Sequence, residues 1–147
     1  MWCEALSVGS GFTLRSGSPE PMTLLFIDDD PEDIELILEA IKIVDPGHRC
    51  FTATNGADGM KMLDVLKPDY IFLDINMPGL GGWDLIKLIR ANPEFDKVPV
   101  CILSTSQNAK EREMFVRMGA STCLSKPSSF HELCEIFRNV LTEKQKP

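Results

Sequence analysis

The sequence lacks the features that would place it in a membrane, in a disulfide scaffold or on nucleic acid. No run of apolar residues is long enough to cross a bilayer. Acidic residues outnumber basic ones by 22 to 15, and the net charge of −7 repels phosphate backbones. The 5 cysteines form an odd set without a CxxC pair, which favours reduced, buried thiols. We therefore expect a cytoplasmic protein that binds neither membranes nor nucleic acid.

The remaining composition is that of a single globular domain. With 147 residues and 44% hydrophobic content, the chain can bury a substantial core. Residues 1–21 contain much Ser, Gly and Pro without periodicity, so we expect a flexible N-terminal extension there. Met22 directly precedes the first apolar run and is a candidate start of the protein. The ordered domain is expected over 22–142, with 143–147 as a short C-terminal tail and no output domain after it.

Short apolar runs alternate with amphipathic stretches along this domain. The runs at 23–27, 70–73 and 98–103 are typical of strands covered on both faces, and weaker strands are expected at 49–54 and 122–125. Amphipathic helices are expected between them, and the last one ends near Leu141. This alternation predicts an α/β fold, a doubly wound five-stranded parallel sheet with the flavodoxin-like order 2-1-3-4-5. His48 and His131 have no ligand-spaced partners, and we expect both on the surface or in loops.

Residues with acid, hydroxyl and ammonium groups follow the predicted strands. Ligands of open α/β sheets bind at the carboxyl ends of the strands, so these groups should meet at one edge. The first strand leads into an acidic triplet, the third into a single acid, the fourth into a hydroxyl pair and the fifth into a lysine. In chain order these residues are Asp28, Asp29, Asp30, Asp74, Ser104, Thr105 and Lys126.

The acidic triplet has two interpretations. One Asp at a helix N-terminus is a common cap, and Asp30 is suited to that role. A cap requires only one carboxylate, however, and Asp28 and Asp29 beside Asp74 would repel one another without a cation. Mg²⁺ bound through carboxylates and waters removes this repulsion. The neighbouring hydroxyl and ammonium suit phosphoryl oxygens, and Asp is a known nucleophile in phosphoryl transfer.

These motifs resemble the receiver domain of two-component response regulators. The matching segments are FIDDD, FLDINMPGLGGWDL, VPVCILSTS and GASTCLSKP, in the order and at the spacing of that family. The resemblance implies that Asp74 is the phosphoacceptor. It also implies that Asp28, Asp29 and Asp74 bind Mg²⁺ together with the backbone carbonyl of Asn76. Asn76 and Thr105 lie where attacking water would enter, so they are expected to tune the lifetime of the phosphate.

The resemblance assigns further roles near the end of the chain. Ser104 matches the hydroxyl residue that binds the phosphoryl group, and Lys126 matches the lysine that pairs with it. A cis peptide bond between Lys126 and Pro127 is implied as well. The family commonly has an aromatic switch residue three positions before the lysine, but this chain has Cys123 there. The usual coupled aromatic switch is therefore not expected.

The family implies a signalling role for a stand-alone receiver. A histidine kinase would donate the phosphoryl group, and DDDPEDIELI and NPEFDKVPVCILSTS are similar to receivers that partner phytochrome-type kinases. The signal would leave through a downstream protein target or a phosphotransfer protein, and a homodimer is a further expectation. Catalysis would be limited to the protein's own phosphorylation and dephosphorylation, so we do not expect a metabolic enzyme.

Three other functions remain open at this point. Phosphatases of the haloacid-dehalogenase type use an Asp-x-Asp pair, whereas this chain has Asn76 at the second position, which cannot transfer protons. A flavin binder would need a loop of hydroxyls and glycine after the first strand, where this chain has three carboxylates. A module that cannot be phosphorylated would be expected to have lost part of the acid, hydroxyl and lysine set.

Overall fold

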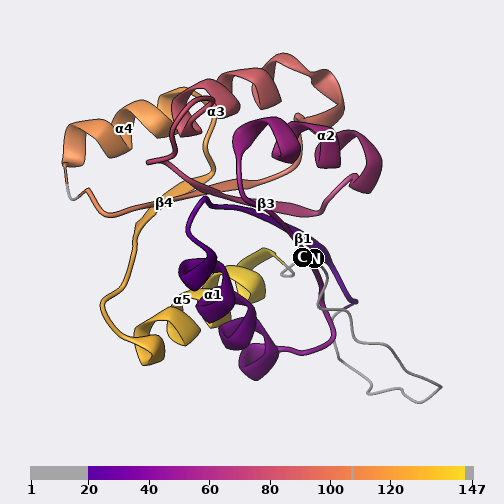
Figure 1. Ribbon diagram of the computed structural model, residues 1–147, viewed down its shortest axis with the longest axis vertical. Coiled ribbons are helices and arrows are strands. Elements are labelled where there is room, and N and C mark those ends of the chain that lie inside the picture. The colour runs from indigo at the N-terminus through magenta and orange to yellow at the C-terminus, as the bar shows by residue number, and fades with distance from the viewer. Residues whose placement is uncertain (1–19, 107, 145–147) are drawn as a thin grey trace.

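A computed structural model describes residues 20–106 and 108–144 of the chain, and these form one α/β domain (Figure 1). The expected extension over 1–21 lies outside the described residues as far as residue 19. The elements in chain order are β1 (Thr23–Ile27), α1 (Pro31–Val44), β2 (Arg49–Ala53), α2 (Gly56–Leu66), β3 (Tyr70–Asp74), α3 (Gly82–Ala91), the 3₁₀ turn η1 (Pro93–Phe95), β4 (Val100–Ser104), α4 (Ala109–Arg117), β5 (Thr122–Ser125) and α5 (Phe130–Lys144).

The five strands form one parallel sheet in the order β2-β1-β3-β4-β5, as the sequence predicts. The register brings the strand ends level with one another. Asp74 pairs with Leu103, and Ser104, the next residue of β4, pairs with Ser125 of β5. The residues that follow these pairs therefore lie along one edge of the sheet.

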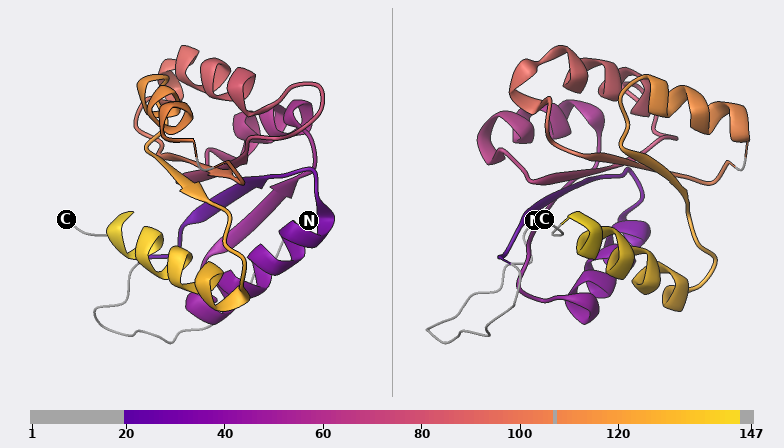
Figure 2. Two further views of the ribbon diagram at one scale, coloured as in Figure 1. Left: turned by 90° about the vertical axis from the view of Figure 1, so that its left-hand side faces the viewer. Right: turned by 180° about the vertical axis from the view of Figure 1, so that it is seen from behind.

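Helices cover both faces of the sheet. In Figure 1, α2, α3 and α4 lie above the strands and α1 and α5 lie below them, and Figure 2 shows the same two layers from the side and from behind. Successive side chains of a strand point to opposite faces. Leu25 and Ile27 of β1 thus join the core under α2, α3 and α4, whereas Leu24 and Phe26 join the core over α1 and α5.

Aromatic rings fill the centre of the core on the α1 and α5 side. Phe72 stacks on Phe26 and on Tyr70, with ring centroids 4.7 and 4.6 Å apart. Phe137 of α5 meets the Phe72 ring edge-on at 5.3 Å. Such pairs stabilise a core beyond the area they bury. They fix α5, and with it the turn after β5, against the strands that carry the site.

Side-chain oxygens cap the N-termini of three helices, and for α1 the cap is the expected Asp30. Asp30 caps α1 by accepting a hydrogen bond from the Glu32 N–H, and Asn55 caps α2 in the same manner. The Ser129 hydroxyl accepts the Glu132 N–H at the start of α5. That helix continues to Lys144, beyond the expected end near Leu141. Among the described residues, no helix has the length and apolar character that crossing a membrane requires.

His48 is expected on the surface or in a loop, and the structure places it in a loop but not on the surface. This residue lies in the turn before β2, but only 2% of its surface is exposed. Its Nδ1 accepts the Met22 N–H at 3.0 Å, and its Nε2 lies 3.4 Å from Asp45 Oδ2. Burial lowers the pKa of His48 and outweighs the opposite effect of Asp45 and Asp69. The ring thus serves as a structural acceptor that fixes the start of β1.

Arg90, in the last turn of α3, joins the α3–β4 connection to the α4–β5 connection. Its guanidinium donates hydrogen bonds to the backbone carbonyls of Phe95, Val98 and Gly119 at 2.6 to 2.8 Å. Gly119 ends α4 with φ +115, and a Cβ there would lie 2.6 Å from the Arg90 side chain. The contact therefore requires glycine at that turn and a planar donor at Arg90.

We expect Arg90→Ala to lower the free energy of unfolding by about 2–4 kcal/mol, because three carbonyls lose a charged donor. Arg90→Lys should recover only part of this loss, since an ammonium cannot donate to the three carbonyls in the planar arrangement of a guanidinium. Urea unfolding followed by circular dichroism measures both. Arg117→Ala, at an exposed position in the last turn of α4, is the control and should change stability by less than about 0.5 kcal/mol. An equal loss of unfolding free energy in Arg90→Ala and Arg117→Ala would contradict this structural role of Arg90.

Candidate functional site

The predicted site residues meet at the carboxyl ends of four strands. Asp28 directly follows β1, Asp74 ends β3, Ser104 ends β4 and Lys126 follows β5. Asp28, Asp74 and Ser104 are buried, each with 4% or less of its surface exposed. The parallel sheet produces this meeting, because its strands all end at the same edge.

Three carboxylates form a cluster at this edge. One oxygen each from Asp28, Asp29 and Asp74 lies within 4.8 Å of the others, a spacing at which they could hold a metal ion. Asp29 is exposed, whereas Asp28 and Asp74 are buried. Asp30 does not belong to this group. Its side chain accepts the Glu32 N–H at 2.9 Å, which confirms its expected role as the helix cap.

The pKa of Asp28 reflects the burial and mutual repulsion of the clustered carboxylates. The pKa of this carboxyl is raised to about 6, chiefly by burial and also by the negative charge of Asp74. The hydrogen bond from the Asp30 N–H to Asp28 Oδ1, at 2.9 Å, and the charge of Lys126 act in the opposite direction. The folded protein thus keeps an acid ionised at neutral pH against its tendency to take up a proton.

Lys126 supplies the positive charge at the site. Its Nζ lies 3.2 Å from Asp28 Oδ2, 3.2 Å from Asp74 Oδ1 and 2.9 Å from Asp33 Oδ2. Burial alone would lower the pKa of Lys126, but the hydrogen bond with Asp33 and the charges of Asp28 and Asp74 outweigh it and raise the pKa. The ammonium therefore stays charged, and it binds both buried carboxylates.

Sequence reasoning missed Asp33. This residue lies in the first turn of α1, one helical turn beyond the acidic triplet, and approaches Lys126 more closely than either cluster acid does. An acidic residue at that position has an ordinary explanation, because it complements the helix dipole. The signal that could have identified it is its place on the side of α1 that faces the end of β5, which only the packing of the helix reveals.

The donor set of the cluster fits a hard divalent cation. Two buried carboxylates and one exposed carboxylate offer only oxygen ligands, which Mg²⁺ prefers, and their mutual repulsion is the feature that such a cation relieves. Asp28, Asp29 and Asp74 would hold it. The Asn76 N–H lies 3.4 Å from Asp74 Oδ1, so the backbone of Asn76 borders the cluster, as a carbonyl ligand must.

The hydroxyl residues flank the acid from β4. Ser104 Oγ accepts the Ser106 N–H at 3.0 Å, which leaves the hydroxyl proton available to another acceptor. Thr105 is exposed, and its Oγ1 lies 3.4 Å from Asn76 Nδ2. The two residues expected to tune the phosphate lifetime thus contact each other at the solvent side of Asp74.

The prediction of a cis peptide bond before Pro127 is wrong. The structure has no cis peptide bond in the described part of the chain, so Lys126 and Pro127 are joined in trans. The trans form is the lower-energy isomer of such bonds by about 0.5–1 kcal/mol. Lys126 reaches the carboxylates in this form, while its N–H donates to the Ser104 carbonyl at 2.8 Å.

Cys123 occupies the switch position without an aromatic ring. The residue is half-buried on β5, and burial raises the pKa of its thiol, with Arg112 lowering it and Glu111 raising it. Arg112 of α4 donates a short hydrogen bond to the Ser125 hydroxyl on the same strand. A charged side chain, rather than a ring, therefore connects α4 to β5 beside the site.

The sequence also matches a family model and known relatives. The model of the response regulator receiver domain matches residues 24–138. Protein PilH of Pseudomonas aeruginosa is 30% identical over 118 residues, which cover 80% of this chain and 96% of PilH. The transcriptional regulatory protein AfsQ1 of Streptomyces coelicolor is 33% identical over 119 residues, 81% of this chain, but the chain spans only 51% of AfsQ1.

A solved structure agrees with these matches. The phosphorylated cyanobacterial phytochrome response regulator RcpA superposes with a TM-score of 0.74 at 25% identity, covering 82% of this chain and 91% of RcpA. The family model, the relatives and the fold agree, and the chain belongs to the response regulator receiver domain family of two-component signalling.

Proposed function

We propose that this receiver accepts a phosphoryl group on Asp74 from a phosphohistidine of a histidine kinase in a Mg²⁺-dependent reaction. The observation that carries the proposal is the position of the Asp74 carboxylate. It is buried between the Lys126 ammonium, 3.2 Å away, and the carboxylates of the acidic cluster. This arrangement places a nucleophile beside positive charge and beside a cation site, which is what phosphoryl transfer requires.

The reaction balances with the residues present. An Asp74 carboxylate oxygen forms a bond to phosphorus while the bond from phosphorus to the histidine nitrogen breaks, and that nitrogen keeps the electron pair. Mg²⁺, when bound, supplies charge neutralisation for the phosphoryl oxygens. Lys126 pairs with one of these oxygens, and Ser104 donates its free hydroxyl proton to another while the Ser106 N–H holds its oxygen in place.

Hydrolysis of the aspartyl phosphate reverses the modification. Water attacks phosphorus, the bond to Asp74 breaks, and the carboxylate is restored. Asn76 and Thr105 lie on the solvent side of Asp74 and contact each other at 3.4 Å, so they stand in the path of this water. Asn76 cannot act as a general acid or base, which argues against turnover of external phosphate esters.

The partners are part of the proposal. A kinase donor follows from the family, in which receivers take phosphoryl groups from histidine kinases. A kinase of the phytochrome type is supported by RcpA, which carries that description. Phosphorylation would shift an equilibrium between two surface states that a downstream target or phosphotransfer protein reads. A cytoplasmic location, a stand-alone protein and a homodimer stay predictions.

Asp74→Asn should abolish phosphorylation, because an amide cannot attack phosphorus. We expect wild-type protein incubated with acetyl phosphate and Mg²⁺ to gain one phosphoryl group, and neither the variant nor wild type with EDTA to gain any. Intact-mass spectrometry measures the adduct. Asp64→Asn removes an exposed acid of α2 and should label like wild type, and an adduct on Asp74→Asn would contradict the assignment.

Asp28→Asn should stabilise the metal-free protein at neutral pH. The folded-state pKa of Asp28 is raised from 3.8 to about 6, so the folded protein binds the extra proton between these values. The stability of wild type relative to Asp28→Asn should therefore fall as pH rises from about 4 to about 6, by on the order of 1–3 kcal/mol.

Urea unfolding at several pH values, with EDTA or with Mg²⁺, measures this difference. Mg²⁺ should stabilise wild type clearly at about pH 7.5 and weakly at about pH 5, because protonated Asp28 is a poor ligand. Asp28→Asn should gain much less from Mg²⁺ at either pH. A difference between the two proteins that does not vary with pH would be inconsistent with the raised pKa.

Thr105→Ala should shorten the lifetime of the phosphate or leave it unchanged, because the smaller side chain opens the path of water beside Asn76. The loss of the adduct after removal of acetyl phosphate gives the lifetime by mass spectrometry. Thr122→Ala, on β5 away from Asp74, is the control. A clearly longer lifetime in Thr105→Ala would refute the shielding role.

A further inference from the structure

Three carboxylates lie within ion-pair distance of the Lys126 ammonium, and two of them, Asp28 and Asp33, accept hydrogen bonds from it. A lysine has three N–H donors and no acceptor. The partners are Asp28, Asp33 and Asp74, and the contact with Asp33 is the shortest at 2.9 Å. Two of these acids belong to the cluster that could hold a metal ion, whereas Asp33 does not. The contact with Asp33 therefore has no part in the metal binding or phosphoryl transfer proposed above.

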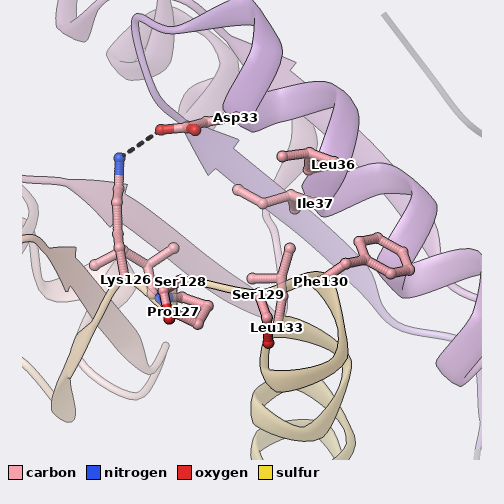
Figure 3. A pocket seen from close by; sticks show the side chains of 10 residues that line it. Asp33, Leu36, Ile37, Lys126, Pro127, Ser128, Ser129, Phe130 and Leu133 are labelled. Atoms are coloured by element: carbon pink, nitrogen blue, oxygen red, sulfur yellow. Dashed lines mark hydrogen bonds and ion pairs between the residues drawn. The ribbon is translucent and has the colours of Figure 1, made fainter.

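Asp33 approaches Lys126 from a different layer of the fold. It lies on α1, and Figure 3 shows its carboxylate and the Lys126 ammonium pointing toward one another across the space between α1 and the turn before α5. Beside this pair is an apolar groove lined by Leu36 and Ile37 of α1 and Phe130 and Leu133 of α5. The packing of α1 on α5 therefore keeps Asp33 within reach of the lysine.

A cation in the acidic cluster changes the balance of forces on Lys126. It neutralises the charges of Asp28 and Asp74 and thereby weakens their attraction for the ammonium. Asp33, outside the cluster, keeps its full attraction. It is then the carboxylate among the three that continues to hold Lys126 while Asp74 reacts.

We propose that Asp33 is a positioning residue that holds Lys126 at the site when the metal and the phosphoryl group engage Asp28 and Asp74. The proposal rests on the proposed function and adds a residue to it. Two consequences follow. Without Asp33, Lys126 competes with Mg²⁺ for Asp28 and Asp74, so Mg²⁺ binds less tightly. Once Mg²⁺ is bound, the lysine is less well placed, so phosphorylation is slower.

The size of the effect is limited by the exposure of the pair. The Asp33 side chain is 36% exposed and that of Lys126 is 19% exposed, and a partly exposed ion pair contributes at most about 1 kcal/mol. We therefore expect Asp33→Asn to weaken Mg²⁺ binding about 2- to 5-fold and to slow phosphorylation at saturating Mg²⁺ by about the same factor.

The first experiment is a calorimetric Mg²⁺ titration of metal-free protein. It compares wild type, Asp33→Asn, Asp33→Glu and Glu32→Gln. Glu32 is an exposed acid in the same turn of α1, so Glu32→Gln removes the same charge without touching Lys126. We expect weakening in Asp33→Asn, recovery in Asp33→Glu, little change in Glu32→Gln, and unfolding free energies within about 1 kcal/mol of one another.

The second experiment tests whether Asp33 acts through Lys126. Asp33→Asn is added to Lys126→Ala, and both the Mg²⁺ affinity and the rate of labelling by acetyl phosphate are measured. If the proposal holds, the added substitution changes neither quantity more than Glu32→Gln does. An undiminished effect in this background would overturn it. If Lys126→Ala does not fold, the comparison of Asp33→Glu with Asp33→Asn takes its place. The proposal is overturned if Asp33→Glu does not recover the Mg²⁺ affinity that Asp33→Asn loses.

The two proposals fail in different ways. Wild-type protein that binds Mg²⁺ but gains no phosphoryl group contradicts the proposed function, while the titration still tests Asp33 by itself. Wild-type protein that is phosphorylated, with Asp33→Asn indistinguishable from Glu32→Gln in both affinity and rate, contradicts only the role of Asp33.

Discussion

The attraction between the Lys126 ammonium and the carboxylates at the end of the sheet is the interaction on which this site depends. Asp28 and Asp74 are buried close together, and Lys126 contacts both at 3.2 Å. Burial of two like charges is unfavourable unless a counter-charge lies within a few ångströms. Lys126, which follows β5, supplies this counter-charge. The parallel sheet makes this possible, because β1, β3 and β5 all end at the same edge.

The same edge of the sheet connects the site residues to helix α4. The Lys126 N–H donates to the Ser104 carbonyl at 2.8 Å, so the two residues that would bind phosphoryl oxygens are joined through the backbone of β4 and β5. Arg112 of α4 binds Ser125 on β5, next to Lys126 and near the half-buried Cys123. Polar contacts therefore connect β4, β5 and α4 beside the site, where the aromatic ring common in the family is absent at position 123.

Stability and function are placed in different parts of the fold. The aromatic stack around Phe72 packs α5 against the sheet, and Arg90 joins the α3–β4 and α4–β5 connections. Asp28, by contrast, keeps a carboxylate ionised at neutral pH although burial raises its pKa to about 6. A site that is unfavourable in the metal-free protein gains most from binding a cation, and the surrounding core tolerates this cost.

The sequence alone determined the fold class, the strand order and the residues that end each strand, because apolar runs and helical periodicity reflect local burial. It also placed Asp28, Asp74, Ser104 and Lys126 at one edge, since parallel strands end together. Only the tertiary structure revealed Asp33 as a partner of Lys126 and His48 as a buried acceptor, and it gave a trans bond before Pro127. The positions of Asp33 and His48 depend on how a helix or turn packs against a distant element, which no local pattern encodes.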